Sequence, residues 1–271
     1  MKIVHSPQCL EFGQSGHPES PERVRKAAEF LRSKDYNFAE PEPCSEEDLL
    51  CVHSRELVEK VREGNFYDPD SPGYEDIYKY ARLSAGGAVK AAEVKGFSLM
   101  RPPGHHATTN SFGGFCYFNN IAVAVRKLGK RTLIVDVDRH HGNGTQEIFK
   151  GSDRVEYVSL HGAGYPGTGR SSTENCYNHL FTSPVNDEEY LAALDEILST
   201  TGEFELVAVS AGFDGYKNDP LASQIRLSKD CYEKIGERIG ELGAPVFCIL
   251  EGGYAADDLG EMIYQFLDGL V

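Results

Sequence analysis

The chain has 271 residues, enough for one large α/β domain with a substantial core. Its 27 lysines and arginines against 42 aspartates and glutamates give a net charge of −15, which argues against nucleic-acid binding and favours cationic or neutral partners. The seven cysteines form no C-x-x-C pair, and no apolar run resembles a membrane span or a signal peptide. We therefore expect one domain, residues 1–271, in a reducing cytoplasm, with no direct binding to nucleic acid or membranes.

The first third of the chain is predicted to be mainly helical. Ser20 and Pro21 are typical of a helix N-cap and first helical residue, and Ser45 and Ser54 precede two further helices. Small residues in the middle of the longest helix indicate tight packing onto a sheet. In chain order these elements are a strand over residues 2–5 and helices over 21–31, 46–51, 55–62 and 77–94.

The remainder of the chain alternates strands with helices. The strands are short apolar runs, most of them rich in β-branched residues. Such alternation predicts βαβ units, and therefore an α/β fold with a mostly parallel sheet and helices on both faces. In chain order the elements are strand 97–100, helix 120–127, strand 132–137, a helix from about 145, strand 155–160, helix 187–200, strand 206–210, helix 228–242, strand 246–250 and helix 258–270.

Polar residues collect where these strands end, which is where parallel sheets carry their sites. Asp136, Asp138 and His140 stand two residues apart, so in extended backbone their side chains face the same way. Two carboxylates and an imidazole on one face are costly to desolvate unless a cation lies between them. These donors suit zinc or ferrous iron. A solvated polar loop is the alternative for this stretch alone, but Asp214, at the end of another strand, could supply a third ligand.

Two histidines and a tyrosine follow other strands. His105 and His106 are candidates for general base and acid because imidazole titrates near neutral pH. Asp136 is placed to accept an imidazole N–H and so to select one tautomer. Tyr254, after two glycines, offers an O–H donor to a developing oxyanion. Beside three metal ligands, which leave coordination positions open, these residues predict a hydrolytic metal site.

Several motifs carry a resemblance to a known family. RPPGHHA, GGFCYFNN, DVDRHHGNGTQ, YPGTG, AGFD and LEGGY occur in this order between Arg101 and Tyr254, and HPESPERV precedes them from His17. Together they resemble the zinc-dependent histone deacetylase family, which includes acetylpolyamine amidohydrolases and acetoin-utilisation proteins. The resemblance implies an arginase-like α/β fold with a mostly parallel eight-stranded sheet. It also implies hydrolysis of acetyl-lysine in proteins, or of an acetylpolyamine, to acetate and free amine.

The resemblance assigns a role to each candidate residue. His106 would be the base that activates water, and Tyr254 would polarise the acetyl carbonyl. The remaining assignments are zinc ligands Asp138, His140 and Asp214; His105 with its acid partner Asp136; an acyl tunnel lined by Gly114, Phe115, Tyr165 and Leu221; and a rim acid, Asp70.

The family also implies structural monovalent cations, with potassium expected. Two positions depart from the family pattern. Asn143 stands where some branches have an aspartate beside the second histidine, which predicts a less basic His106. Arg139 replaces a smaller or apolar residue, and alternation points it away from the metal. The implied cation sites are Asp136, Asp138, His140, Ser159 and Leu160 for the first, and Phe149, Ser152 and Val155 for the second.

Two other functions remain open. A family member without efficient turnover would bind acyl-lysine and hydrolyse no acyl substrate, although Tyr254 argues against this because loss of its hydroxyl disables such a site. A ureohydrolase of the arginase type would share the implied fold. That chemistry needs a two-metal cluster with more aspartates, so two metal ions per chain would favour it.

Overall fold

The computed structural model describes residues 1–271, and its centre is an eight-stranded sheet in which all neighbouring strands are parallel. The strands are β1 (Ile3–Val4), β2 (Phe38–Ala39), β3 (Phe97–Ser98), β4 (Thr132–Asp136), β5 (Val155–Gly162), β6 (Cys176–Phe181), β7 (Leu206–Ala211) and β8 (Val246–Leu250). Their spatial order is β2-β1-β3-β8-β7-β4-β5-β6. The predicted α/β class with a parallel sheet is confirmed.

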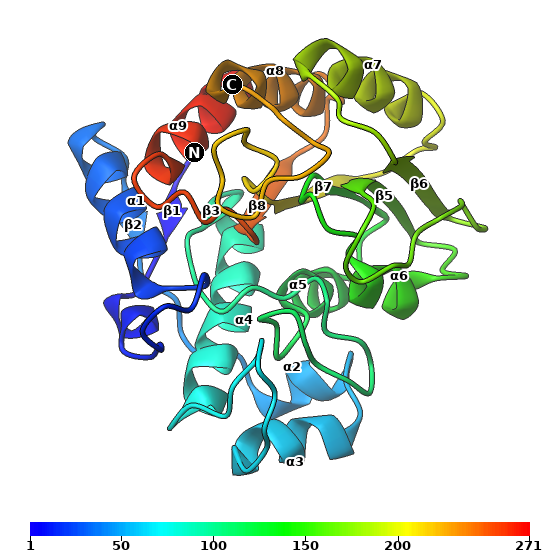
Figure 1. Ribbon diagram of the computed structural model, residues 1–271. Coiled ribbons are helices and arrows are strands. Elements are labelled where there is room, and N and C mark those ends of the chain that lie inside the picture. The colour runs from blue at the N-terminus through cyan, green and yellow to red at the C-terminus, as the bar shows by residue number, and fades with distance from the viewer.

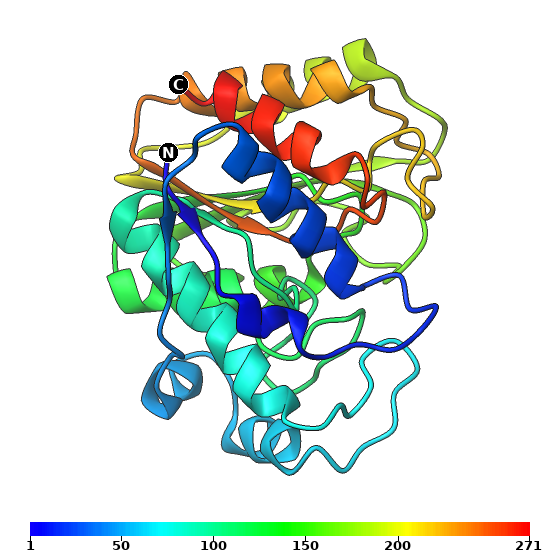
Figure 2. The same cartoon turned by 90° about the vertical axis from the view of Figure 1, so that its left-hand side faces the viewer.

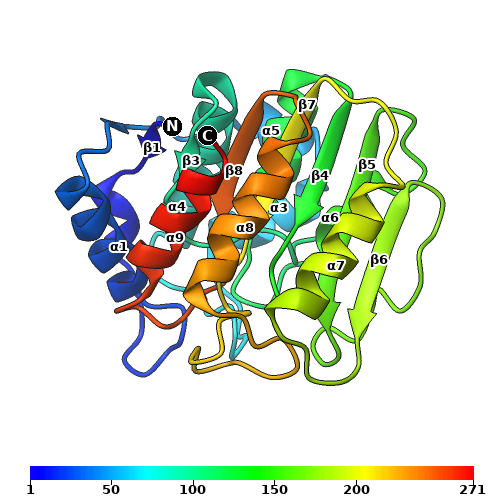
Figure 3. The ribbon, with the colours of Figure 1, turned by 90° about the horizontal axis from the view of Figure 1, so that it is seen from above.

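Helices cover both faces of this sheet (Figures 1 and 2). One face carries α1 (Pro21–Ser33), α7 (Asp187–Leu198), α8 (Lys229–Gly240) and α9 (Leu259–Gly269), which lie in a row when the sheet is seen from above (Figure 3). The other face carries α4 (Ile77–Val94), α5 (Asn120–Leu128) and α6 (Asn143–Phe149), with α2 (Glu46–Leu50) and α3 (Arg55–Glu63) packed on α5 and α4. A 3-10 helix, Pro7–Leu10, follows β1.

The strand side chains alternate between two hydrophobic cores. Leu133 and Val135 of β4 belong to the core beneath α7, α8 and α9, whereas Ile134 belongs to the core beneath α4 and α5. This is the period of two that a strand buried on both faces requires. None of the helices combines the length and the apolar character needed to cross a membrane.

The residue pattern predicted six of the strands and missed β2 and β6. β2 has only two residues, too few to show a pattern. β6 reads CYNHLF and forms one edge of the sheet, where Asn178 and His179 are only partly buried. An edge strand has a neighbour on one side only, so it need not be a continuous apolar run.

Four central strands bring the predicted site segments together. β3, β8, β7 and β4 are consecutive in the sheet, so the loops that follow their carboxyl ends lie at the same edge. The register of β4 places Asp136 opposite Ser210 of β7 and Ser159 of β5. Residues far apart in sequence are thus placed around the end of β4.

Candidate metal and catalytic site

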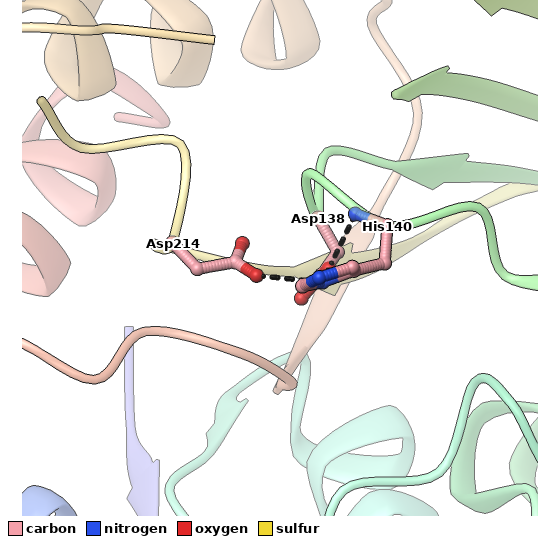
Figure 4. Close-up of side chains that lie close together, drawn as sticks. All are labelled: Asp138, His140 and Asp214. Atoms are coloured by element: carbon pink, nitrogen blue, oxygen red, sulfur yellow. Dashed lines mark hydrogen bonds and ion pairs between the residues drawn. The ribbon is translucent and has the colours of Figure 1, made fainter. Parts of the chain in front are cut away.

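Asp138, His140 and Asp214 converge from the loops after β4 and β7 (Figure 4). His140 Nδ1 lies 3.1 Å from Asp138 Oδ1 and 2.9 Å from Asp214 Oδ2, and possible ligand atoms of the three residues lie within 4.8 Å of one another. Both carboxylates are fully buried. The Asp214 Oδ2 contact does not have hydrogen-bond geometry, so this buried oxygen has no hydrogen-bond partner.

The two carboxylates of this triad favour a positive charge between them. Burial would raise the pKa of Asp138, but the imidazoles of His105 and His140 hold that pKa well below its ordinary value. Burial would lower the pKa of His140, but Asp214 and Asp138 raise it to about 9. Both shifts arise because two buried carboxylates stabilise a cation between them. Two carboxylates and one imidazole fit Zn²⁺ or Fe²⁺ and leave positions for water and substrate.

Two glycines allow backbone to approach these carboxylates closely. A Cβ at Gly212 would lie 2.4 Å from Asp138 Oδ2. A Cβ at Gly252 would lie 2.5 Å from the same oxygen and 2.8 Å from Asp214 Oδ2. The Gly252 N–H donates to Asp138 Oδ2 over 2.8 Å. Any side chain at either position would displace a ligand oxygen.

His105 is tied to Asp136, as the resemblance implied. Its Nδ1 lies 3.1 Å from Asp136 Oδ2, which also accepts the Tyr157 hydroxyl at 2.9 Å. Burial opposes a charge on His105, but Asp136, Asp138 and Glu251 raise its pKa to about 10. These carboxylates favour the protonated imidazole, a state that does not suit a general base.

His106 is paired with Asn143 instead. Its Nδ1 lies 2.8 Å from Asn143 Oδ1, an oxygen that can only accept, so Nδ1 carries the proton and Nε2 keeps its lone pair. Burial, together with the positive charges of His105 and His140, holds the pKa of His106 well below its ordinary value. A neutral ring with a free nitrogen is the state that a general base requires.

A cavity of about 210 Å³ opens onto these side chains. All five residues predicted for the tunnel and rim line it. The two adjacent histidines, one candidate metal ligand and the predicted oxyanion donor Tyr254 also line it. Pro103 and Gly252, which no sequence pattern singled out as wall residues, complete it. The predicted residues in its wall are Asp70, His105, His106, Gly114, Phe115, His140, Tyr165, Leu221 and Tyr254.

Aromatic rings form the sides of this cavity. Tyr165 meets His106 edge-on at 5.0 Å between ring centroids, and Phe115 meets Tyr254 edge-on at 5.7 Å. Gly114 has φ +56, and a Cβ there would lie 2.6 Å from the His106 ring and 2.9 Å from that of Tyr165. Burial raises the pKa of Tyr254 well above its ordinary value, so its hydroxyl keeps its proton.

The residues of the first predicted monovalent-cation site meet at the ends of β4 and β5. Ser159 of β5 is opposite Asp136 of β4, and Leu160 is the next residue. The backbone carbonyls of Asp138 and His140 accept no hydrogen bond. Unpaired carbonyls beside a buried carboxylate are costly unless a cation satisfies them, so these residues fit a monovalent cation.

The proton arrangement at Ser159 agrees with that role. His161 Nε2 lies 3.1 Å from the Gly169 carbonyl and must donate to it, so His161 Nδ1 accepts a proton from the Ser159 hydroxyl at 2.9 Å. Burial lowers the pKa of His161 to about 3, which keeps the ring neutral. The hydroxyl proton is thereby directed to His161, and the Ser159 oxygen lone pairs are left for a cation.

The second predicted cation site fits less well. The side-chain NH₂ group of Asn175 donates to the carbonyls of Phe149 and Val155, at 2.9 and 2.6 Å. That amide occupies the place between two of the three expected carbonyl ligands, the third belonging to Ser152. A cavity lined by Phe149, Ser152 and Val155 also carries three exposed cations and one exposed carboxylate, a net positive charge that opposes another cation: Arg126, Lys130, Arg154 and Asp153.

A buried ionic cluster supports the site from the amino-terminal segment. Glu19 accepts from Arg101 Nη2 at 2.6 Å and from Arg23 Nη1 at 3.0 Å. Arg23 also donates to the carbonyls of Glu251 and Gly253, at 2.6 and 2.5 Å. These residues lie in the motifs HPESPERV, RPPGHHA and LEGGY. Glu19 and Arg23 are four residues apart, but the other contacts join positions 82 to 230 residues apart, which no local pattern reveals.

Glu251 is a second support that the sequence pattern did not identify. Its Oε2 accepts the peptide N–H groups of Gly104 and His105, at 2.7 and 3.2 Å, and its Oε1 accepts the Ser210 hydroxyl at 3.2 Å. Burial raises the pKa of Glu251 to about 7. This carboxyl joins the ends of β7 and β8 to the loop that carries the adjacent histidines.

Known proteins resemble this chain over its whole length. Residues 17–270 match the family model described as the histone deacetylase domain. A protein of Methanothermobacter thermautotrophicus named "Probable deacetylase" is 38% identical over 301 residues, which cover 100% of this chain and 90% of that protein. Acetylpolyamine amidohydrolase 1 of Pseudomonas aeruginosa is 35% identical over 75% of this chain and 65% of its own length.

Solved structures show the same fold. The HDA15 HD domain superposes with a TM-score of 0.91 at 30% identity, covering 99% of this chain and 88% of that one. An acetylpolyamine aminohydrolase from Burkholderia pseudomallei superposes with a TM-score of 0.92 at 24% identity, covering 100% and 98%. The chain therefore belongs to the histone deacetylase domain family, in which this chain's relatives are named as deacetylases and acetylpolyamine amidohydrolases.

Proposed function

We propose that residues 1–271 form one catalytic domain, a metal-dependent deacetylase that hydrolyses an N-acetylated amine to acetate and free amine. The substrate would be acetyl-lysine in a protein or an acetylpolyamine. The observation that carries this proposal is the set of two buried carboxylates and one partly buried imidazole. It lies beside a cavity lined by a histidine whose pKa is lowered and a tyrosine whose pKa is raised.

Asp138, His140 and Asp214 would hold the divalent ion, zinc or ferrous iron. When bound, such an ion lowers the pKa of a water molecule and polarises the acetyl carbonyl. A monovalent cation, with potassium expected, would be held by the carbonyls of Asp138 and His140 and by the Ser159 hydroxyl. Its positive charge would offset part of the cost of burying the nearby carboxylates.

His106 acts as the base in this proposal. Its Nε2 takes the proton from the attacking water, while Asn143 holds Nδ1–H and so keeps the ring in the required tautomer. His105 stays positively charged beside Asp136 and offsets the negative charge that develops. Tyr254 donates its O–H to the oxyanion. When the carbon–nitrogen bond breaks, protonated His106 returns the proton to the leaving amine.

The cavity walls suit an extended amine. Phe115, Tyr165 and Leu221 would pack against an alkyl stem, and Asp70 is exposed at the rim, where its carboxylate can bind a second cationic or N–H group. The chain's net charge of −15 favours the approach of cationic substrates. A volume of about 210 Å³ leaves room for a short acyl group beyond the stem.

A comparison of kcat/KM for an acetyl-lysine peptide, an acetylpolyamine and their longer acyl analogues tests this function. We expect hydrolysis of at least one acetylated amine and weaker hydrolysis of its longer acyl analogues. A chelator or the substitution Asp138→Ala should abolish the hydrolysis of all these substrates. Hydrolysis that ignores the chelator and this substitution would overturn the proposal. Tight binding of an acyl-lysine peptide without any turnover would support the non-catalytic alternative.

A further inference from the structure

The loop that carries Tyr254 is held at successive peptide groups by buried charged side chains. Arg23 binds the carbonyls of Glu251 and Gly253, and Asp138 binds the N–H of Gly252. Two further N–H groups of this loop, those of Tyr254 and Ala255, donate to a different carboxylate. That carboxylate has no part in the catalytic steps proposed above.

Asp219, in the loop between β7 and α8, supplies this carboxylate. Its Oδ2 accepts the N–H groups of Tyr254 and Ala255, at 2.6 and 3.1 Å. Its Oδ1 accepts the N–H of Leu221 at 2.8 Å. One side chain therefore joins the backbone of Tyr254 to the backbone of Leu221, and both of these residues line the substrate cavity.

The surroundings of Asp219 are not those of a group kept for stability. The residue is 5% exposed, and no Lys, Arg or His forms an ion pair with it. Burial and the negative charge of Asp214 raise the pKa of Asp219 to about 6. A buried carboxylate with only N–H donors around it carries a desolvation cost that an apolar residue would avoid. Its distinctive feature is that its two oxygens bind the backbone of two different residues that line the cavity.

We propose that Asp219 is a positioning residue: Oδ2 sets the place of the Tyr254 hydroxyl through the peptide of Tyr254, and Oδ1 sets the place of the Leu221 side chain. The role rests on the proposed deacetylase function. The Oδ2 contact governs transition-state stabilisation and therefore kcat, because an oxyanion donor must be correctly placed. The Oδ1 contact governs the fit of the substrate stem and therefore KM.

A double-mutant cycle with Tyr254→Phe tests this assignment. Asp219→Asn leaves one acceptor oxygen for the N–H groups of Leu221 and of the Tyr254 loop. Its NH₂ group then faces a backbone N–H that it cannot bind. We expect Asp219→Asn to lower kcat by about 10- to 100-fold in the wild-type background. In the Tyr254→Phe background, where no hydroxyl remains to be misplaced, it should lower kcat by less than about 2-fold. The rise in KM should appear in both backgrounds.

Asp257→Asn is the matched control. Asp257 follows shortly after Tyr254 on the same loop, but its side chain is 86% exposed and pairs only with Lys26, so we expect wild-type kinetics. If Asp219→Asn does not fold, Asp219→Glu takes its place in the cycle, because it keeps both oxygens and moves them by one methylene.

The outcomes separate the two proposals. An equal loss of kcat in both backgrounds would show that Asp219 acts only on general stability and would overturn the positioning role, while the deacetylase function stands. A wild-type protein that hydrolyses no N-acetylated amine would overturn the deacetylase function, and the positioning role with it.

Discussion

His106 Nδ1 lies 2.8 Å from the side-chain oxygen of Asn143, so the assigned base is oriented by a neutral amide rather than by a carboxylate. An amide fixes the tautomer but does not stabilise the imidazolium as a negative charge would. Burial and the neighbouring positive charges of His105 and His140 hold the pKa of His106 down, and the neutral amide offsets them less than a carboxylate would.

Asn143→Asp should move the acid limb of the pH profile of kcat/KM to higher pH. The new carboxylate raises the pKa of His106, so more of the base is protonated and inactive at a given pH. We expect a displacement on the order of one pH unit. Asn110→Asp, an exposed change of the same kind, should leave the profile unchanged. Superimposable acid limbs for wild type and Asn143→Asp would refute the assignment of His106 as the base.

Tyr254→Phe should reduce kcat strongly and KM little. The substitution removes only the O–H that donates to the oxyanion, and loss of one such donor costs about 100- to 1,000-fold in kcat. Steady-state kinetics with an acetyl-lysine peptide measure the effect. Tyr177→Phe changes a partly buried tyrosine of β6 outside the site and should retain wild-type kcat. A Tyr254→Phe enzyme as fast as wild type would exclude this tyrosine from the chemistry.

Glu19→Ala should destabilise the fold. Glu19 is 3% exposed and is the carboxylate partner of both Arg101 and Arg23, so its removal leaves two buried cations without their counter-charge. Breaking a buried pair of this kind costs about 3–5 kcal/mol, which urea unfolding would show. Glu22→Ala, which breaks an exposed pair with Arg25 in the same helix, should cost less than about 1 kcal/mol. Similar losses in both variants would be inconsistent with this view of the cluster.

Acid should weaken the fold through His53. Its Nδ1–H donates to the Thr108 carbonyl and its Nε2 accepts the Asn119 N–H, both at 2.9 Å. Burial lowers the pKa of His53 to about 4 from an ordinary value of 6.5. The unfolded chain therefore takes up this proton first, and the stabilisation present above pH 6.5 is lost as the pH falls towards 4.

His53→Gln removes this titration while keeping a donor and an acceptor. Between pH 7.5 and pH 5, the free energy of unfolding of the wild type should fall by about 2 kcal/mol more than that of the variant. Urea unfolding at the two pH values measures the difference. Identical pH dependence in both proteins would show that His53 is not the titrating group.

The sequence predicted those features that depend on residues close together in the chain. β4, β5, β7 and β8 are recognisable because strands buried on both faces are nearly continuous apolar runs. The candidate ligands and histidines lie in the loops that follow strands, so topology brings them to one edge of the sheet. Family resemblance then supplied the order of roles among them.

The supporting residues could not be found in this way. Asp219 and Glu251 are single acids in loops. Asp219 accepts an N–H group 35 residues away and Glu251 accepts one 147 residues away, so their roles depend on distant segments. Asn175, similarly, has side-chain partners 20 and 26 residues away, and these contacts count against the second cation site. Such contacts depend on how loops fold over the sheet, and neither spacing nor hydrophobic period encodes that.

Titration of the metal-free protein with zinc, followed by amide hydrolysis, addresses the metal site itself. Asp138, His140 and Asp214 form one three-ligand site, so activity should rise to a plateau at one zinc ion per chain and remain absent in Asp138→Ala at the same zinc concentration. A plateau that requires two ions per chain, or hydrolysis that proceeds equally well without any metal, would contradict this assignment.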